Sequence, residues 1–548
     1  MQIAVLKIPA FCAPNAGIFI LPMNSDDQAR YKKTEIADIP QAPDYYPNLL
    51  WHRQTDRYWE YWYYYDGEKL DEQVEGGITE SGDTALKYPL KINLVKMAVQ
   101  KHAFCLLGEY DETGILEFHA KRKRGQKSEG EGIDDPVAQE VDSFLEDVWD
   151  ENNAMSILPE QARIAHVCGG CVFKVAYDDR KKNKVRLEVI LPDYFFPIWD
   201  GGDYHNLLEA IISYQIPTAE AVHKYGLNPD STTGDTVLYQ EKWTKDRYEI
   251  TVDGKPAVSP HGIPYSGKNP YIDPETDQGI IPFEYLPVDR TGEFYGTSII
   301  PGIMGLQNEY NVRLADIGDA INEAVHPLRF GRNLPKQRKD IKLSRYKIVN
   351  LGQNPPNQDP PEVGYVEHPG LPTGTNEFID ELKGSFREIA HTPPVAYGVD
   401  EGSQRSALTL AFRMWPTTSF TRDTRATWNG GYASLNRKIM IVHMVKAAAK
   451  ESRVTNDHLG YTLMTIWPPI IPRDREQQVS ENILLVQARL RSPETALRNL
   501  GDVDDIDAEI ERIKQWQDYL ASLVAQQASA EQQAEGEVKP PEAQPVVE

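Results

Sequence analysis

The chain has 548 residues, of which 40% are hydrophobic and 26% are charged, so it can bury the cores of several domains. Its formal net charge of -24 at pH 7 argues against a protein that grips DNA or an anionic membrane over its whole surface. Residues 3–20 lack the charged start of a signal peptide, and no apolar run approaches the roughly 18 to 20 residues of a membrane span. We therefore expect an acidic globular protein made inside the cell, with no membrane partner.

Residues 1–44 carry no firm periodicity, so we interpret them as an N-terminal arm. The segment from Leu49 to Tyr65 is rich in tryptophan and tyrosine and ends at the turn signal Asp66-Gly67. Such aromatic side chains could stack on nucleic-acid bases. We favour packing against protein, because tryptophan and tyrosine are over-represented at interfaces.

Residues 90–290 mix helical and alternating patterns, which predicts an α+β body. An amphipathic helix begins at Pro136 and continues to Trp149. From Cys171 onward the pattern alternates and predicts a hairpin followed by further strands. The predicted strands are residues 172–177, 185–190, 195–200, 207–216, 236–243 and 248–252.

Two long helical patterns follow this body and flank an insertion. The first opens at Phe294, places apolar residues at three- and four-residue spacing, and stops at His326-Pro327. The second covers residues 375–390, with its apolar residues on one stripe. A helix of about 25 residues measures roughly 37 Å, which exceeds what a domain core needs. We therefore predict that the pair forms a shaft.

The insertion between these helices carries a local reversal of charge. Its basic residues are Arg329, Arg332, Lys336, Arg338, Lys339, Lys342, Arg345 and Lys347. Asp340 is the single acidic residue within that run. The run could be a solvated loop, could hold a nucleic-acid backbone, or could meet an acidic partner surface.

After the second long helix, residues 391–404 form a loop by composition. Residues 406–449 return to a helical pattern. Proline at 416 and the pair Gly430-Gly431 predict that this long helix is interrupted and kinked at both places.

Two further helices are predicted near the C-terminus. The first follows Ser492, a good N-cap residue, and extends to Leu500. The second covers residues 506–524. The tail, residues 525–548, is rich in Gln, Ala, Glu and Pro, so we expect it to be disordered.

No familiar catalytic or cofactor motif occurs in the sequence. It contains no GxxxxGK[ST] phosphate loop, no HExxH, no GxSxG and no dinucleotide fingerprint. Cys168 and Cys171 have the spacing of a redox or half-zinc motif, but no second pair completes four ligands. We interpret them as small residues at the start of a buried strand, and we expect no catalytic residue, metal or cofactor.

The order of these elements resembles the portal proteins of tailed bacteriophages, over residues 45–520. The pieces that carry the resemblance are Trp51 with Tyr65-Asp66-Gly67, Ile92-Asn93, the helix 136–149, Gly169-Gly170, Pro197-Ile198-Trp199-Asp200, Gly292-Glu293-Phe294-Tyr295-Gly296, the paired helices, Ser406-Ala407-Leu408, Trp467-Pro468, Ser492-Pro493-Glu494-Thr495 and Ile506 to Ile513. The sequence departs from the family pattern in three places: the N-terminal arm has no counterpart, Pro301 lies inside the first long helix, and Arg405 stands where small residues are usual.

The resemblance implies an α+β portal fold with an α/β wing, a two-helix stem, a small α/β clip, a long kinked tunnel helix and an α-helical crown. The implied segments are the arm (1–44), the wing (45–296), stem helix 1 (297–324), the clip (325–374), stem helix 2 (375–390), the tunnel loop (391–404), the tunnel helix (405–450), the wing return (451–491), the crown (492–524) and the tail (525–548). The site residues that the resemblance implies in the tunnel loop are Tyr397, Asp400, Glu401 and Gln404.

The resemblance also implies a function and a set of partners. It points to a dodecameric ring at one capsid vertex, a channel through which double-stranded DNA is packaged and later ejected. The implied partners are the terminase large subunit, a head-tail adaptor, and the major capsid and scaffolding proteins. The protein would be found in the virion, and in the host cytoplasm during assembly.

An acidic face on the first stem helix would suit such a channel. Asp316, Asp319 and Glu323 lie at three- and four-residue spacing, so they share one face. This face could line the bore, where contact with DNA must be weak and independent of sequence, or it could form salt bridges between subunits. We favour the bore. The basic clip would then bind adaptor proteins or the packaging motor.

Two other functions remain open at this point. The chain could form a different virion connector, such as a tail adaptor ring. It could also be a thiol or zinc enzyme that uses Cys168 and Cys171.

Overall fold

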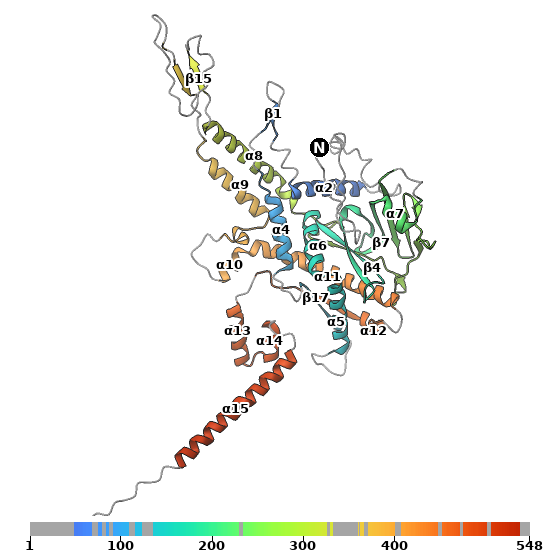
Figure 1. The fold of residues 1–548 in the computed structure, drawn as a ribbon, viewed down its shortest axis with the longest axis vertical. Helices are drawn as coiled ribbons and strands as arrows, with labels where there is room; N and C mark the ends of the chain where they lie inside the picture. Colours follow the sequence, from blue (N-terminus) through green and yellow to red (C-terminus); the bar gives the residue numbers. More distant parts are fainter. Residues whose placement is uncertain are drawn as a thin grey trace, which may run out of the picture. The chain divides into compact units, whose positions relative to one another are not determined.

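Figure 1 shows a computed structural model of the chain. The structure describes residues 49–67, 75–78, 84–86, 91–108, 115–122, 135–228, 234–325, 329–332, 360, 362–365, 371–399, 407–447, 452–471, 475–500 and 506–536. The chain divides into two compact units, residues 1–470 and residues 471–548. The predicted N-terminal arm lies outside the described residues.

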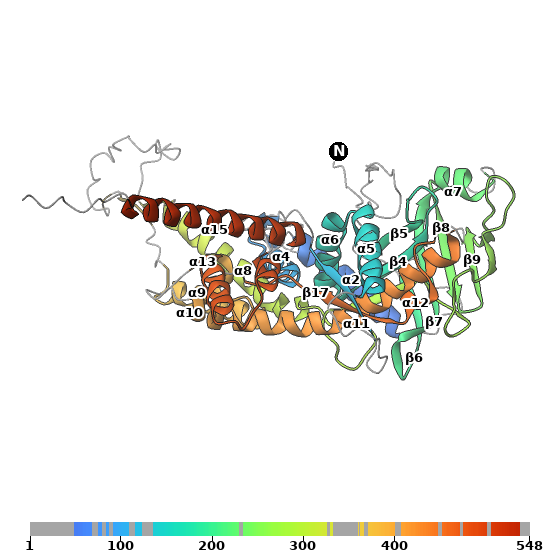
Figure 2. The same ribbon diagram turned by 90° about the horizontal axis from the view of Figure 1, so that it is seen from below.

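A three-stranded antiparallel sheet lies at the centre of the first unit. Its middle strand is β4 (Gly170–Tyr177), which pairs with β5 (Val185–Ile190) and β14 (Phe283–Pro287). Helices α5 (Pro136–Glu151), α6 (Ala154–Cys168) and α11 (Trp415–Lys446) pack against it, and Figure 2 shows them next to β4. The large core formed here includes Phe144, Trp149, Phe173, Trp428 and Tyr432.

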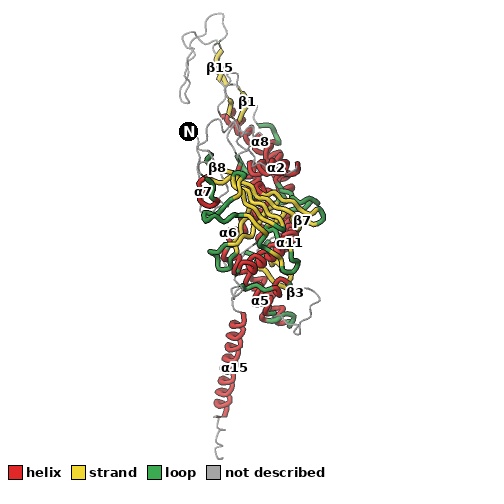
Figure 3. Tube along the Cα trace, turned by 90° about the vertical axis from the view of Figure 1, so that its right-hand side faces the viewer, coloured by secondary structure: helices red, strands yellow, loops and turns green. Residues whose placement is uncertain are grey.

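The second sheet of this unit has six strands and is visible in yellow in Figure 3. Its strands follow the order β10-β9-β8-β7-β6, and β11 pairs with β9. The bounds are β6 (Phe195–Asp200), β7 (Asp203–Pro217), β8 (Thr236–Thr244), β9 (Arg247–Val252), β10 (Lys255–Pro256) and β11 (Ser266–Lys268). Lys174 of β4 reaches this sheet, where its ammonium lies 2.6 Å from the carboxylate of Glu241. Burial of either charge without a partner would be unfavourable. Because the two opposite charges lie in contact, each stabilises the charged form of the other.

Two long helices, α8 (Ile300–Val325) and α9 (Thr375–Ile389), lie side by side in Figure 1 and contact each other. Both were predicted from the sequence. Between them in the chain, β15 (Arg329–Arg332) and β16 (Glu362–Tyr365) form an antiparallel pair. Pro301 is the second residue of α8, in the first turn, where a proline ring costs no intrahelical hydrogen bond.

The base of α8 shares a core with α2 (Leu49–Asp66) and α4 (Leu94–Leu107). The aromatic segment predicted from the sequence is therefore a helix. Its tyrosines Tyr58, Tyr61, Tyr64 and Tyr65 are buried, while Trp59 remains 48% exposed. Packing is confirmed for these four side chains, and they pack against helices of the same chain.

The smaller elements of the first unit complete the α+β architecture. They are β1 (Glu75–Ile78), β2 (Thr84–Leu86), β3 (Glu117–Arg122), η1 (Pro192–Tyr194), α7 (Thr218–Tyr225), β12 (Ile272–Asp273), β13 (Gln278–Gly279), η4 (Pro394–Tyr397), α10 (Ala407–Arg413), α12 (Asn456–Leu459) and β17 (Tyr461–Ile466). Strand β17 pairs with β3, which lies far away in the sequence. In the described residues, each helix is too short or too polar to cross a lipid bilayer.

The prediction of a break at Gly430-Gly431 is wrong. Helix α11 runs through both glycines without interruption, while the predicted break near Pro416 is present between α10 and α11. A Cβ atom on Gly431 would lie 1.9 Å from Cδ2 of Leu286, whereas Gly430 has open space. Gly431 is thus explained by the close approach of α11 to β14, not by a helix break.

The second unit consists of three helices in its described part. They are α13 (Arg475–Gln487), α14 (Pro493–Leu500) and α15 (Ile506–Gly536). The hydroxyl of Ser492 accepts a hydrogen bond from the backbone N–H of Thr495, as expected of an N-cap. The prediction of disorder from Ala525 onward is wrong for residues 525–536, which continue α15. This stretch is rich in Ala, Gln and Glu, which all favour helix.

The two neighbouring glycines of α11 provide a matched test of packing. We expect Gly431→Ala to lower the free energy of unfolding by about 1–3 kcal/mol, because the new methyl group overlaps Leu286. Gly430→Ala should instead stabilise the protein by about 0.5–1 kcal/mol, since alanine favours the helix and meets no neighbour. Denaturant unfolding of both variants measures the difference. Equal stabilities would show that α11 does not pack this closely on β14.

Candidate functional site

The paired helices α8 and α9 and the segment that leaves α9 carry the sequence-predicted site residues whose side chains the structure describes. The base of α8 is fixed by the buried amide of Gln307. Its Oε1 accepts hydrogen bonds from the backbone N–H groups of Leu94 (2.8 Å) and Val95 (3.2 Å), and its Nε2 donates to the carbonyl of Ile92 (2.7 Å). The first turn of a helix leaves such N–H groups without partners, so Gln307 satisfies the start of α4 from another helix.

Asn93 joins the same junction to α2. Its Nδ2 donates to the carbonyls of Tyr64 (3.1 Å) and Tyr65 (3.0 Å), which end α2, while its Oδ1 caps α4 through the N–H of Lys96 (2.8 Å). Asn308 of α8 donates to the phenol oxygen of Tyr64 at 2.8 Å. Side-chain amides therefore connect the end of α2 and the start of α4 to the first half of α8.

The chain enters α8 through a close contact between two glycines. A Cβ atom on Gly296 would lie 2.1 Å from the carbonyl oxygen of Gly169, and one on Gly169 would lie 2.4 Å from that of Gly296. Next to this contact, the hydroxyl of Ser298 donates to the carbonyl of His166 at 3.0 Å and accepts from the N–H of Ile300 at 3.1 Å. The start of α8 is thus attached to the end of α6.

The end of α9 is held on two sides. Nε2 of His102 in α4 donates to the carbonyl of Ala390 at 2.6 Å, and the hydroxyl of Thr417 in α11 donates to the carbonyl of His391 at 2.6 Å. Burial, with nearby His166, lowers the pKa of His102 to about 3, so its imidazole is neutral at pH 7. His391 has a φ of 53°, a left-handed conformation that ends the helix sharply.

Two of the three acidic residues predicted on α8 have described side chains, and both are partly exposed. Asp316 lies 3.2 Å from the guanidinium of Arg313, which also contacts Glu309 at 2.6 Å. Part of this negative charge is therefore balanced within the helix, although such exposed pairs contribute little stability. Asp319 lies three residues farther along α8. The side chain of Glu323 lies outside the described residues.

Tyr397 is the one residue of the predicted tunnel loop set that the structure describes. It ends η4, and its ring lies 5.7 Å from the ammonium nitrogen of Lys101 and 5.9 Å from the guanidinium carbon of Arg387. Burial raises the pKa of its phenol. Tyr397 thus packs between α4 and α9. Asp400, Glu401 and Gln404 lie outside the described residues.

The basic insertion can be located only in part. Arg329 and Arg332 are the ends of β15, opposite Tyr365 and Glu362 of β16. The structure does not describe the side chains of these two arginines. The other four predicted residues lie wholly outside the described residues: Lys336, Arg338, Lys339 and Lys342. The pairing of β15 with β16 brings the two ends of the insertion together.

Cys168 and Cys171 are fully buried free thiols, Cys168 at the end of α6 and Cys171 in β4. Burial raises the pKa of Cys171 to about 12 and that of Cys168 well above its ordinary value. A reactive cysteine needs a lowered pKa and access to solvent. The interpretation as buried core residues is confirmed for both, but only Cys171 lies at the start of the strand, since Cys168 ends helix α6. Among the described residues, no group of three or more His, Cys, Asp or Glu is placed to hold a metal ion.

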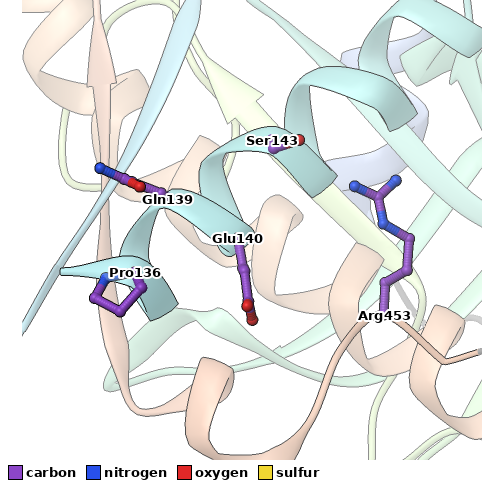
Figure 4. Close-up of a pocket in the computed structure, with 5 residues that line it drawn as sticks. All are labelled: Pro136, Gln139, Glu140, Ser143 and Arg453. Carbon is purple, nitrogen blue, oxygen red and sulfur yellow. The ribbon is translucent and has the colours of Figure 1, made fainter. Parts of the chain in front are cut away.

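An open hollow on the surface is lined by Pro136, Gln139, Glu140, Ser143 and Arg453. Figure 4 shows Arg453 opposite the helix that carries the other four residues. Nε2 of His458 lies 3.3 Å from the carboxylate of Glu140, and Arg453 forms an ion pair with Asp147. Both charged residues of the hollow thus have partners within the protein. We assign no ligand to it.

Residues 49–521 match the model of a family described as phage portal protein, SPP1 Gp6-like. The match covers most of the 548-residue chain. No curated protein matches the chain.

The junction at the base of α8 can be tested at Gln307. We expect Gln307→Leu to lower the free energy of unfolding by about 1–3 kcal/mol, because it leaves buried backbone groups of α4 without partners. Asn322→Leu, which replaces an exposed amide of the same helix, should change it by only about 0.5 kcal/mol. Denaturant unfolding compares the two. A Gln307→Leu variant as stable as its control would contradict the role given to this amide.

Proposed function

Because this chain belongs to the family of phage portal proteins described as SPP1 Gp6-like, we propose that it forms a dodecameric ring at one vertex of the capsid and that double-stranded DNA passes through the ring. The observation that carries the proposal is the family match over residues 49–521. The α8–α9 pair supports it, since two long adjacent helices from each copy would build the wall of a channel.

Each part of the chain has a role in this proposal. The body that contains both sheets forms the wing, α8 and α9 form the stem, and the insertion with β15 and β16 forms the clip. The loop after α9 faces the channel, with Tyr397 at its described end and Asp400, Glu401 and Gln404 beyond. Helices α10 and α11 form the tunnel helix, and the helices of the second unit form the crown.

The acidic face of α8 lines the bore in this arrangement. A conduit must not retain DNA, and every cation that contacts a phosphate adds salt-dependent affinity. Carboxylates such as Asp316 and Asp319 repel phosphate and weaken that contact. The ion pairs of Arg313 with Glu309 and Asp316 reduce the negative charge of this face and therefore weaken the repulsion.

Packaging and ejection require partners that change with the stage of assembly. The ring binds the terminase large subunit while DNA enters, and then a head-tail adaptor. It also contacts the major capsid and scaffolding proteins. The clip is the surface that we assign to terminase and adaptor, because its basic sequence contrasts with a chain of net charge -24.

Imaging of the purified full-length protein tests the ring. We expect electron micrographs to show a wide-winged ring with a narrow stalk, and a symmetry-resolved reconstruction to place Asp316 and Asp319 of α8 toward the axis. A protein that stays monomeric under all assembly conditions would exclude the proposal. If the reconstruction places these carboxylates between neighbouring copies, their role is to form salt bridges between subunits and not to line the bore.

Charge reversal tests the clip. We expect the triple variant Arg338→Glu, Lys339→Glu and Lys342→Glu to lose capture of the phage's own adaptor in a pull-down assay, because like charges now oppose each other. A matched triple reversal outside the clip, Lys181→Glu, Lys182→Glu and Lys184→Glu, should leave capture unchanged. Normal adaptor capture by the clip variant would reject the assignment, provided that imaging shows intact rings.

A further inference from the structure

Helix α15 exposes an apolar face in its middle, between residues 516 and 524. The side chains of this face are Trp516 (60% exposed), Tyr519 (54%), Leu520 (43%), Leu523 (37%) and Val524 (65%). At 100° per residue they fall within an arc of about 140° on one side of the helix. A soluble protein usually buries such a face, and an exposed one marks an interaction site.

The second unit itself covers only the beginning of this helix. Ile506, Ile510 and Ile513 are half-buried, and α15 contacts α14. Each described residue from 514 to 525 is exposed. In proteins, most of the stability of a helix comes from the packing of an amphipathic face rather than from helix propensity. The apolar face of residues 516–524 therefore needs a partner.

The charges beside this face disfavour nucleic acid and anionic membranes. Between residues 506 and 525 there are four acidic residues, Asp507, Glu509, Glu511 and Asp518, and two basic residues, Arg512 and Lys514. Phosphate groups would be repelled by this excess of negative charge. Trp516 and Tyr519 are the side-chain types that dominate the energy of protein-protein contacts. The occupant is therefore a protein.

The spacing of the face fits a helix that is identical and parallel to it. Trp516, Leu520 and Leu523 are separated by four and three residues, the repeat of a coiled-coil seam. Two positions flank this seam, one on each side. In a parallel pair in register, the residue on one flank of a helix faces the residue five positions later, on the other flank, of its neighbour. That rule brings Tyr519 opposite Val524. The seam and its flank are then both apolar.

We propose that α15 packs side by side with α15 of the neighbouring copies through Trp516, Tyr519, Leu520, Leu523 and Val524. This inference rests on the proposed ring, because rotational symmetry gives every copy of a helix the same height and the same tilt relative to the ring axis. If α15 runs along that axis, as the proposal requires, its copies are parallel and in register. In a closed ring, each helix presents one flank to each of two neighbours. The broad face, wider than a two-stranded seam, provides both contacts.

Disulfide cross-linking of the full-length protein tests this contact. In a Cys12→Ser background, the double variant Tyr519→Cys with Val524→Cys places one thiol at each flank of the face. Mild oxidation should convert most of the monomer band on a non-reducing gel into a ladder of covalent multimers. Either single variant should give no ladder. The matched control, Glu511→Cys with Ser522→Cys, places two exposed thiols on the opposite side of the helix and should also give none.

Imaging of the same preparations separates this inference from the proposed function. Rings that form without a ladder would overturn the helix contact and leave the ring intact. A ladder of equal extent in the control would show random collision and would also overturn the contact. Failure of every variant and of the parent chain to form rings would remove the proposed function, and the contact with it.

Discussion

The placement of α8 depends on one buried side chain, the amide of Gln307. A helix start leaves N–H groups without partners, and α4 begins inside the protein, where water cannot supply them. Gln307 supplies an acceptor for two of these groups and a donor for the carbonyl of Ile92. The orientation of α8 is therefore tied to the start of α4, and through Asn93 to the end of α2.

Much of the fold follows from local patterns. Helices α5, α8 and α9 carry clear apolar stripes, and the strands from β4 to β9 alternate or end at turn signals, so both kinds of element were predicted close to their observed bounds. Helix α6 was missed, because Pro159 lies inside it and interrupts the expected pattern. Strand β14 was missed because all five of its residues are buried and show no alternation.

The site was harder to predict, because its contacts join distant parts of the chain. Gln307 lies 213 positions from Leu94, and nothing in its own helix marks it as a cap. Gly431 is required by the close approach of α11 to Leu286. In the sequence alone, however, a glycine pair in a helical pattern looks the same whether it allows close packing or breaks the helix. The acidic residues of α8 were placed on one face by spacing alone, but their pairing with Arg313 depends on side-chain conformations.

The contact between Gly169 and Gly296 has a mechanical consequence. Main-chain atoms touch directly at this joint, with no side-chain torsion between them that could rotate to absorb a displacement. A load applied along α8 is therefore transmitted to the end of α6 and the neighbouring strand β4 by rigid backbone. The long helix pair is coupled stiffly to the sheet that anchors it, and bending must occur elsewhere in the chain.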